Sequence, residues 1–274
     1  MDDKKVGEFW DENAENWTKL SRMGYDRCRN LINTPAFFKM LPKVSGLIGL
    51  DIGCGEGYNT RIAAKKGGKM TAIDISETFI KYAKETEEHE HLGIKYQLAN
   101  AIDLPFPDEY FHFIMATMSF MDIADHEKAL AETFRVLIPN GFFQFSISHP
   151  ITHSSVWEWV RDENGKIRSS DGTLQTRKRG FIVKDYFKKV NGEISEWIFG
   201  AAPTELTENM KKFRIPRFNH TLSGWFNLLI KIGYILEEFC EPYASDEILK
   251  EYPEEYDSRI APFFLIIRCR KPNL

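Results

Sequence analysis

The fold class is decided by residues 47–57, which read LIGLDIGCGEG. The first six residues form a short apolar run that stops at the first of three glycines, a pattern typical of a buried β-strand that ends in a tight loop. A helix is predicted directly afterwards, over residues 59–66. A strand, a glycine-rich loop and a helix in this order form a common cradle for nucleotide-like ligands, because the backbone amides at the start of the helix face the ligand.

The spacing of the glycines distinguishes between two kinds of ligand. Gly53, Gly55 and Gly57 follow a Gly-x-Gly-x-Gly pattern, whereas a dinucleotide fingerprint needs its third glycine one position later, where this chain has Tyr58. Asp51 stands two residues before the first glycine, where a carboxylate would repel a pyrophosphate and favour a ligand that carries an ammonium and a sulfonium group. The loop therefore predicts a sulfonium cofactor rather than a dinucleotide.

A second acidic residue, Asp74, ends the next predicted strand, residues 69–74. In nucleotide-binding α/β folds, an acidic side chain at this point binds the two ribose hydroxyls. The alternative is that Asp74 caps the following helix, although Ser76 is available for that purpose.

Strand and helix patterns alternate along most of the chain. This alternation of short apolar strands with helices predicts an α/β fold, a Rossmann-like, seven-stranded, mostly parallel sheet with helices on both faces. The seven strands are expected at residues 47–52, 69–74, 94–98, 110–115, 142–148, 234–240 and 262–270.

Three parts of the chain are distinguished by pattern. Residues 1–44 are predicted to form an N-terminal helical cap, and residues 45–149 with 220–274 form the Rossmann-like domain. Between them, residues 150–219 alternate glycines with aromatic and polar stretches, which is typical of hairpins and loops. This segment is expected to be an inserted lid or substrate region rich in β-structure.

Composition and charge exclude several classes of function. The formal net charge of −4 over 274 residues lacks the strongly basic footprint of a nucleic-acid binder. The four cysteines form no CxxC pair, so neither a zinc site nor a disulfide framework is expected. We find neither a signal-peptide pattern nor an apolar run long enough to span a bilayer, and we expect a cytoplasmic location.

Four segments together resemble class I S-adenosylmethionine-dependent methyltransferases of the type 11 group. Residues 50–57 match the first motif of that family and residues 72–76 match the second, while 100–106 match the segment beside the adenine and 135–141 match the turn into the fifth strand. The resemblance is strong over residues 45–149 and looser towards the C-terminus. It implies S-adenosylmethionine as cofactor and S-adenosylhomocysteine as product.

The resemblance also implies a set of cofactor-binding residues. Many family members have Asp where this chain has Asn100, which keeps an acceptor for the adenine amino group but loses the charge. In similar enzymes an N-terminal helix closes over the cofactor. Trp17 and Tyr25 are therefore further candidates for cofactor contact, and the alternative is that they pack in the core. The expected cofactor residues are Asp51, Gly53, Cys54, Gly55, Asp74, Ile75, Asn100, Ala101, Ile102, Thr117 and Met118, with Trp17 and Tyr25 from the N-terminal segment.

Histidines at the two ends of the insertion are the candidate catalytic bases. Methyl transfer from a sulfonium is an in-line displacement, so alignment and exclusion of water are the main tasks, and a base is needed only when the nucleophile starts protonated. His149 and His220 would lie together if the insertion folds back as a lid. With His153 they are an alternative metal site, but no carboxylate spacing supports one, and no metal is expected.

The residues of the insertion also indicate what kind of molecule accepts the methyl group. Aromatic residues such as Trp159, Trp197 and Phe199 favour a small, partly apolar acceptor. The basic residues of 161–189 are either a solvated hairpin face or a patch that attracts an acidic substrate.

The predicted function is methyl transfer to a small molecule, with no nucleic-acid or membrane partner. The alternatives are a methyltransferase acting on RNA or protein, and a non-catalytic regulatory protein that binds the cofactor. The motifs indicate neither the acceptor nor the oligomeric state.

Overall fold

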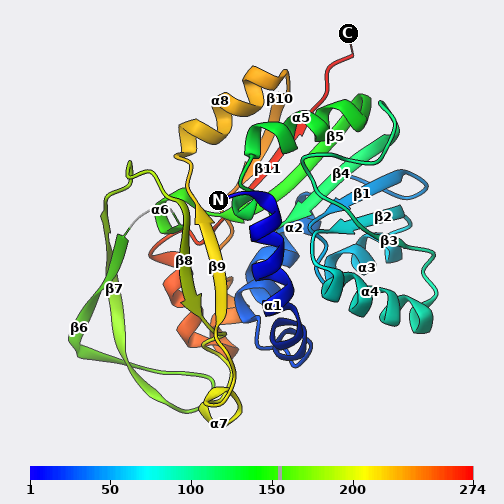
Figure 1. Ribbon diagram of the computed structural model, residues 1–274. Helices are drawn as coiled ribbons and strands as arrows, with labels where there is room; N and C mark the ends of the chain where they lie inside the picture. Colours follow the sequence, from blue (N-terminus) through cyan, green and yellow to red (C-terminus); the bar gives the residue numbers. More distant parts are fainter. Residues whose placement is uncertain (154–155, 274) are drawn as a thin grey trace.

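A seven-stranded sheet lies at the centre of the computed structural model, which describes residues 1–153 and 156–273 (Figure 1). Its strand order is β10-β11-β5-β4-β1-β2-β3, and β11 alone runs antiparallel to its neighbours. The predicted mostly parallel sheet is confirmed. The strands are β1 (Ile48–Ile52), β2 (Lys69–Asp74), β3 (Lys95–Leu98), β4 (Phe111–Thr117), β5 (Leu137–Ser148), β10 (Ile235–Cys240) and β11 (Phe264–Arg270).

Both faces of the sheet are covered, which explains why its strands are continuous apolar runs. Along β5, Phe143 and Phe145 pack into one core cluster, which also holds residues of α5 (His126–Val136) and α8 (Leu222–Ile232). The intervening Gln144 points to the opposite face, where its buried Nε2 donates to the Phe37 carbonyl at 2.8 Å. Successive side chains of a strand alternate between faces, so one strand contributes to two cores.

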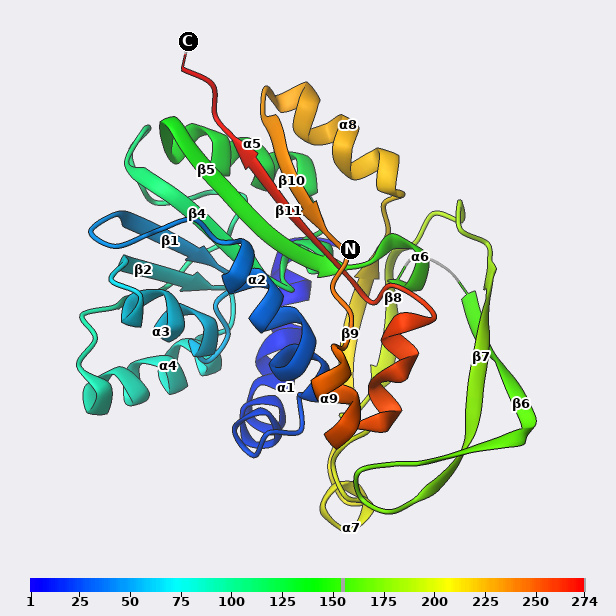
Figure 2. The ribbon, with the colours of Figure 1, turned by 180° about the vertical axis from the view of Figure 1, so that it is seen from behind.

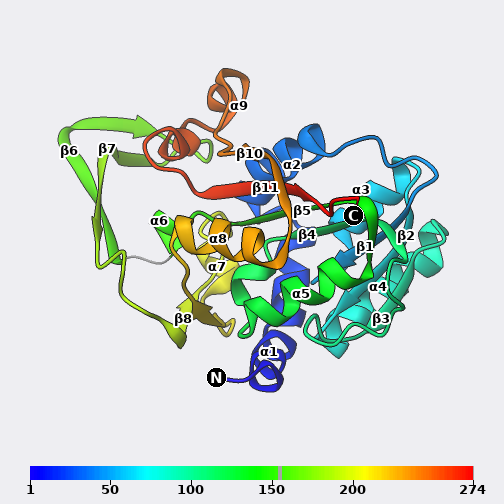
Figure 3. The ribbon, with the colours of Figure 1, turned by 90° about the horizontal axis from the view of Figure 1, so that it is seen from above.

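The second core cluster holds helices α2 (Thr34–Met40), α3 (Tyr58–Lys65) and α4 (Glu77–Glu90) against the other face of the sheet. Seen from above, α5 and α8 lie on one side of the strands and α2 on the other (Figure 3). The predicted N-cap of α4 is confirmed, because the Ser76 hydroxyl accepts the backbone N–H of Phe79 at 3.1 Å.

The N-terminal segment is helical, as predicted, and lies outside the sheet. It contains α1 (Asp3–Arg22) and a short π-helix η1 (Arg29–Asn33) that continues into α2. Asp2 caps α1 by accepting the backbone N–H of Lys5 at 2.9 Å. On its inner face α1 packs against α4 and against strand β9 (Phe213–Phe218) of the insertion, so it joins the two parts of the molecule.

The insertion after β5 begins with α6 (Pro150–His153) and then forms two separate two-stranded antiparallel sheets. One is the hairpin of β6 (Val156–Arg168) and β7 (Leu174–Lys184), which arches away from the central sheet (Figure 2). The other pairs β8 (Asn191–Trp197) with β9, and α7 (Thr204–Thr207) lies between these two strands in the chain. Three short helices connect sheet strands: η2 (Phe120–Asp122) follows β4, while α9 (Asp246–Glu251) and η3 (Pro253–Arg259) lead to β11.

One boundary differs from the prediction. Strand β5 begins at Leu137, so the Pro139-Asn140-Gly141 stretch that we expected to be a turn lies within the strand. Asn140 nevertheless has a φ of +62°, and the pairing of β5 with β4 shifts register near this point. The predicted turn is therefore an irregularity inside a longer strand.

Candidate cofactor and acceptor site

The glycine loop between β1 and α3 has the conformation that its sequence predicts. Gly53, Gly55 and Gly57 all have positive φ angles, +70°, +55° and +86°. A Cβ atom on Gly53 would lie 2.3 Å from the Ser119 Cβ, so this glycine permits close approach of the loop that follows β4. A Cβ atom on Gly55 would meet no atom within 4 Å, which leaves open space above the loop for a ligand.

Asp74 is fixed against this loop by two backbone amides. Its Oδ2 accepts the N–H of Gly55 at 2.8 Å, and its Oδ1 accepts the N–H of Ser76 at 2.9 Å. Burial raises the pKa of Asp74 to about 6, and the amides of Ser76 and Gly55 oppose this rise by stabilising the charged form. The carboxylate also lines the cavity described next, where each oxygen keeps a lone pair for a ligand hydroxyl.

A cavity of about 1190 Å³ opens at the carboxyl ends of β1, β2, β3 and β4, where open α/β sheets place their ligands. Its walls come from α1, the glycine loop, η2, η3 and the insertion. Most of the predicted cofactor residues line this cavity: Trp17, Tyr25, Gly53, Cys54, Gly55, Asp74, Ile75, Asn100, Ala101, Thr117 and Met118.

Two of the predicted cofactor residues do not line the cavity, and our interpretation of Asp51 is corrected. Asp51 is fully buried under the loop, where its Oδ2 accepts the Thr60 hydroxyl at 2.5 Å. Burial raises its pKa to about 7, so the side chain ties α3 to β1 and does not present a carboxylate to a ligand. Ile102 packs against the core, and its N–H donates to Asn100 Oδ1 at 3.2 Å.

The two predicted catalytic histidines also lie outside the cavity walls, which corrects that expectation. His149 is buried, with its Nδ1 accepting the Ile151 N–H and its Nε2 2.9 Å from Glu241 Oε1. His220 packs its ring against His126 and Trp225, with centroid distances of 4.3 Å and 5.1 Å. At the ends of β5 and β9, the two imidazoles contact Glu241, His126 and Trp225 and do not line the cavity.

His153, which we ranked below the other two, does line the cavity. Burial, and after it the Arg217 charge, lowers the pKa of its imidazole to about 4, so the ring is neutral at physiological pH. Among residues 1–153 and 156–273, no group of three His, Cys, Asp or Glu side chains is placed to share a metal ion.

One side of the cavity is a charged wall that the sequence did not reveal. We use this name for Asp26, Arg27, Lys178, Glu254 and Asp257, which all line the cavity. Arg27 pairs with Glu254, and Lys178 pairs with Asp257, while Asp26 lies 3.3 Å from its partner Arg29. Of the basic residues in 161–189, only Lys178 is on the cavity wall, so the structure gives no basic patch facing a substrate. The residues of the charged wall come from three segments that are distant in the sequence and share no motif.

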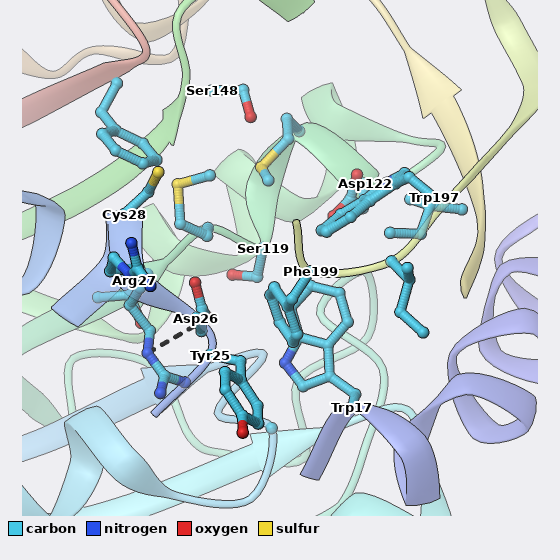
Figure 4. A pocket seen from close by; sticks show the side chains of 18 of the residues that line it. Trp17, Tyr25, Asp26, Arg27, Cys28, Ser119, Asp122, Ser148, Trp197 and Phe199 are labelled. Carbon is cyan, nitrogen blue, oxygen red and sulfur yellow. Dashed lines mark ion pairs between the residues drawn. The ribbon is translucent and has the colours of Figure 1, made fainter. Parts of the chain in front are cut away.

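The other side is an aromatic wall, which we define as Trp17, Trp197 and Phe199. The Trp17 ring lies 5.5 Å from that of Trp197 and 4.9 Å from that of Phe199, in edge-to-face contacts. In Figure 4 this wall lies with Asp122 across the cavity from Arg27 and Cys28. Helix α1 and the insertion thus meet directly over the space beside the glycine loop.

Comparison with known proteins agrees with this geometry. A family described as "Methyltransferase domain" matches residues 50–145. A demethylmenaquinone methyltransferase of Tropheryma whipplei (strain Twist) is 34% identical over 113 residues, 41% of this chain and 46% of that protein. The ubiquinone/menaquinone biosynthesis C-methyltransferase of Proteus mirabilis is 35% identical over 97 residues, 34% of this chain and 39% of that protein. The matched part thus spans less than half the length of these relatives.

Residues 50–145 carry the methyltransferase domain that this family describes. The open space above Gly55 beside the Asp74 carboxylate fits S-adenosylmethionine, the cofactor that the sequence motifs predict. Two solved structures share the fold over 86% of this chain at 24% identity: a methyltransferase from Mesorhizobium loti (TM-score 0.64, covering 96% of that chain) and a putative one from Listeria monocytogenes (TM-score 0.66, covering 95%).

Proposed function

We propose that this chain transfers a methyl group from S-adenosylmethionine to a small, partly apolar molecule. The observation that carries the proposal is that one cavity joins the glycine loop and Asp74 to the aromatic wall. Its volume of about 1190 Å³ exceeds the ~300–1,000 Å³ of typical small-molecule sites, so a cofactor and a second small molecule fit in it together.

The chain's own residues account for binding and for alignment. We infer that the backbone of Gly53 and Gly55 approaches the methionine portion, that Asp74 binds the ribose, and that Asn100 and Ala101 flank the adenine. When bound, S-adenosylmethionine supplies a methyl group on a sulfonium, which a nucleophile displaces in line. The aromatic wall excludes water from the space beside the glycine loop, which keeps the nucleophile oriented and desolvated.

Neither displaced histidine is needed for this function. Alignment and desolvation are sufficient when the acceptor's proton leaves after transfer, so we do not assign a base to His149 or His220. The N-terminal helix and residues 150–219 act together as the lid, with Tyr25 beside the cofactor and Trp17 between the cofactor and the acceptor.

The proposal also concerns which class of molecule accepts the methyl group. Names of the relatives include a demethylmenaquinone methyltransferase, a ubiquinone/menaquinone biosynthesis C-methyltransferase and a malonyl-[acyl-carrier protein] O-methyltransferase, and the acceptors in those names are small molecules or a carrier-bound acid. RNA and protein acceptors remain the alternative function, but the formal net charge of −4 counts against RNA. No helix of the described residues is long and apolar enough to cross a membrane. We propose a cytoplasmic location, consistent with four free cysteines.

Radiolabelled methyl transfer tests the function directly. The purified chain is incubated with methyl-labelled S-adenosylmethionine and a cell extract that has been fractionated into small molecules, RNA and protein. We expect label in the small-molecule fraction, with the Asp74→Ala variant as the inactive control. Label only in RNA or protein would replace the proposal by the alternative function, and no transfer to any fraction would support a regulatory protein that only binds the cofactor.

A further inference from the structure

Asp122 is a buried acid of the cavity wall, and one oxygen of its carboxyl group has no hydrogen-bond partner among the described residues. It ends η2, three residues after Ser119, whose Cβ approaches the glycine loop at Gly53. Asp122 is 5% exposed and lines the cavity, yet its Oδ1 receives no hydrogen bond from any described residue. Buried carboxyl groups in proteins are normally paired or fully hydrogen-bonded, so an exception at a ligand cavity points to a ligand.

The electrostatic surroundings of Asp122 lack a compensating positive charge. Burial alone accounts for the rise in the pKa of Asp122, with no opposing contribution from a Lys, Arg or hydrogen-bond donor of the described chain. Four Lys and Arg side chains line the cavity, and none of them contributes to the pKa of Asp122. Arg27 pairs with Glu254, Lys178 with Asp257 and Arg29 with Asp26, while the Arg217 guanidinium donates to the backbone carbonyl of His153. Figure 4 places Arg27 on the opposite side of the cavity from Asp122.

The aromatic wall on Asp122's side of the cavity carries no cation either. The Lys and Arg side chains that stack on rings in the described part of the chain use other aromatic residues, and none lies over Trp17, Trp197 or Phe199. Trp197 is 38% exposed, so part of its ring is open to contact. Aromatic faces together with a carboxyl group form the usual binding site for an ammonium group.

We propose that Asp122 and the aromatic wall bind the amino group of the methyl acceptor, which is a small primary or secondary amine with an apolar body. An amine supplies the hydrogen-bond donors and the positive charge that Asp122 lacks, and its apolar body packs on Trp17, Trp197 and Phe199. The inference rests on the proposed function and deepens it by naming the acceptor class.

The chemistry agrees with this assignment. The bound ammonium first releases one proton to solvent, and the resulting neutral amine uses its lone pair to form a bond to the methyl carbon. The carbon–sulfur bond breaks at the same time, and the positive charge passes from sulfur to nitrogen. The product is therefore a methylated ammonium ion together with neutral S-adenosylhomocysteine. A carboxylate and aromatic faces at the nitrogen stabilise the charge that develops there.

Matched pairs of ligands test the proposal by calorimetry with the protein saturated in S-adenosylhomocysteine. Phenethylamine and tryptamine are the amines, and 2-phenylethanol and tryptophol are their neutral alcohol counterparts of the same shape. We expect at least one amine to bind about tenfold or more tightly than its alcohol. The Asp122→Asn variant is expected to bind the two members of each pair equally, within about twofold.

Two controls separate a specific contact from other effects. Glu205→Gln removes another acid of the cavity wall, an exposed one on α7, and is expected to keep the amine preference. Affinity for S-adenosylhomocysteine, which carries an ammonium of its own, is measured for each variant. It should be unchanged in Asp122→Asn, and a loss of tenfold or more would assign Asp122 to the cofactor and overturn the proposal.

The possible failures are distinguishable. If wild-type protein does not bind S-adenosylhomocysteine, the proposed function itself fails. If it does bind but the amines show no advantage over the alcohols, or the advantage survives in both Asp122→Asn and Asp122→Leu, the acceptor class is wrong while the methyltransferase function stands.

Discussion

The Asp74 carboxylate and the Gly55 amide are joined by a hydrogen bond of 2.8 Å that links the end of β2 to the loop after β1. Both residues line the same cavity, and the bond orients the carboxylate beside the open space above the loop. This contact joins the glycine loop to Asp74, the acid that we propose binds the ribose, so each part of the predicted cofactor site positions the other.

Substitution of Asp74 is expected to weaken cofactor binding more than it weakens the fold. Asp74→Ala removes the acceptor for two ribose hydroxyls, and hydrogen bonds to a charged group contribute about 1.5–3 kcal/mol each, so S-adenosylhomocysteine should bind roughly 100- to 10,000-fold less tightly. Calorimetry measures the loss, with Asp103→Asn as the matched control, because Asp103 is exposed and does not line the cavity. Equal effects of the two substitutions would contradict a ribose contact by Asp74.

The two glycines of the loop make a matched pair for a stability prediction. Alanine at either position adopts an unfavourable positive φ, but only at Gly53 would the new methyl group overlap Ser119. We expect Gly55→Ala to cost about 1 kcal/mol and Gly53→Ala at least about 2 kcal/mol more, measured by urea unfolding. The double variant Gly53→Ala with Ser119→Gly should recover part of the difference. A Gly53→Ala variant as stable as Gly55→Ala would mean that the loop after β4 does not approach Gly53 closely.

The raised pKa of Asp51 predicts that the stability of the folded chain depends on pH. Its pKa is about 7 in the folded chain against a usual 3.8, so between these values the folded state holds a proton that the unfolded state has lost. Unfolding then releases a proton, and the contribution of Asp51 to stability falls by about 1.4 kcal/mol per pH unit from about pH 4 to 7. Asp51→Asn removes this slope, so its stability relative to wild type should rise with pH over that range. Parallel curves for the two proteins, from denaturant unfolding at several pH values, would show that Asp51 ionises normally.

His149 is expected to be dispensable for methyl transfer. Its imidazole is buried beside Glu241 and does not reach the cavity, so His149→Gln should retain transfer within about threefold of wild type, whereas a lost general base costs about 100-fold or more. Transfer is measured with labelled S-adenosylmethionine and whichever extract fraction accepts the methyl group. A loss of 100-fold without a change in S-adenosylhomocysteine affinity would restore His149 to the reaction.

The sheet and the glycine loop were predictable from the sequence because their signals are local. The positive φ of Gly53 and the strand before it follow from spacing alone, and Asp74 follows from its place at the end of the next strand. Asp51 was misinterpreted because its position in the sequence does not tell whether a carboxylate faces the ligand or lies beneath the loop. Thr60, one turn into α3, was the local sign that Asp51 has a partner within the fold.

The acceptor side of the cavity was not predictable in this way. Asp122, Arg27 and Trp197 come from segments that meet only through tertiary packing, and no spacing rule connects them. His149 and His220 were judged from their closeness to the ends of the insertion, but small rotations of the chain at those ends decide which way an imidazole points. The aromatic richness of 150–219 did indicate an apolar covering, and the Trp17–Trp197 contact is consistent with one.

Calorimetric titration of the wild-type chain with S-adenosylhomocysteine and, separately, with NADH tests the central claim most directly. The account predicts binding of S-adenosylhomocysteine with a Kd on the order of micromolar and no measurable binding of NADH. Tight binding of NADH with no binding of S-adenosylhomocysteine would contradict it.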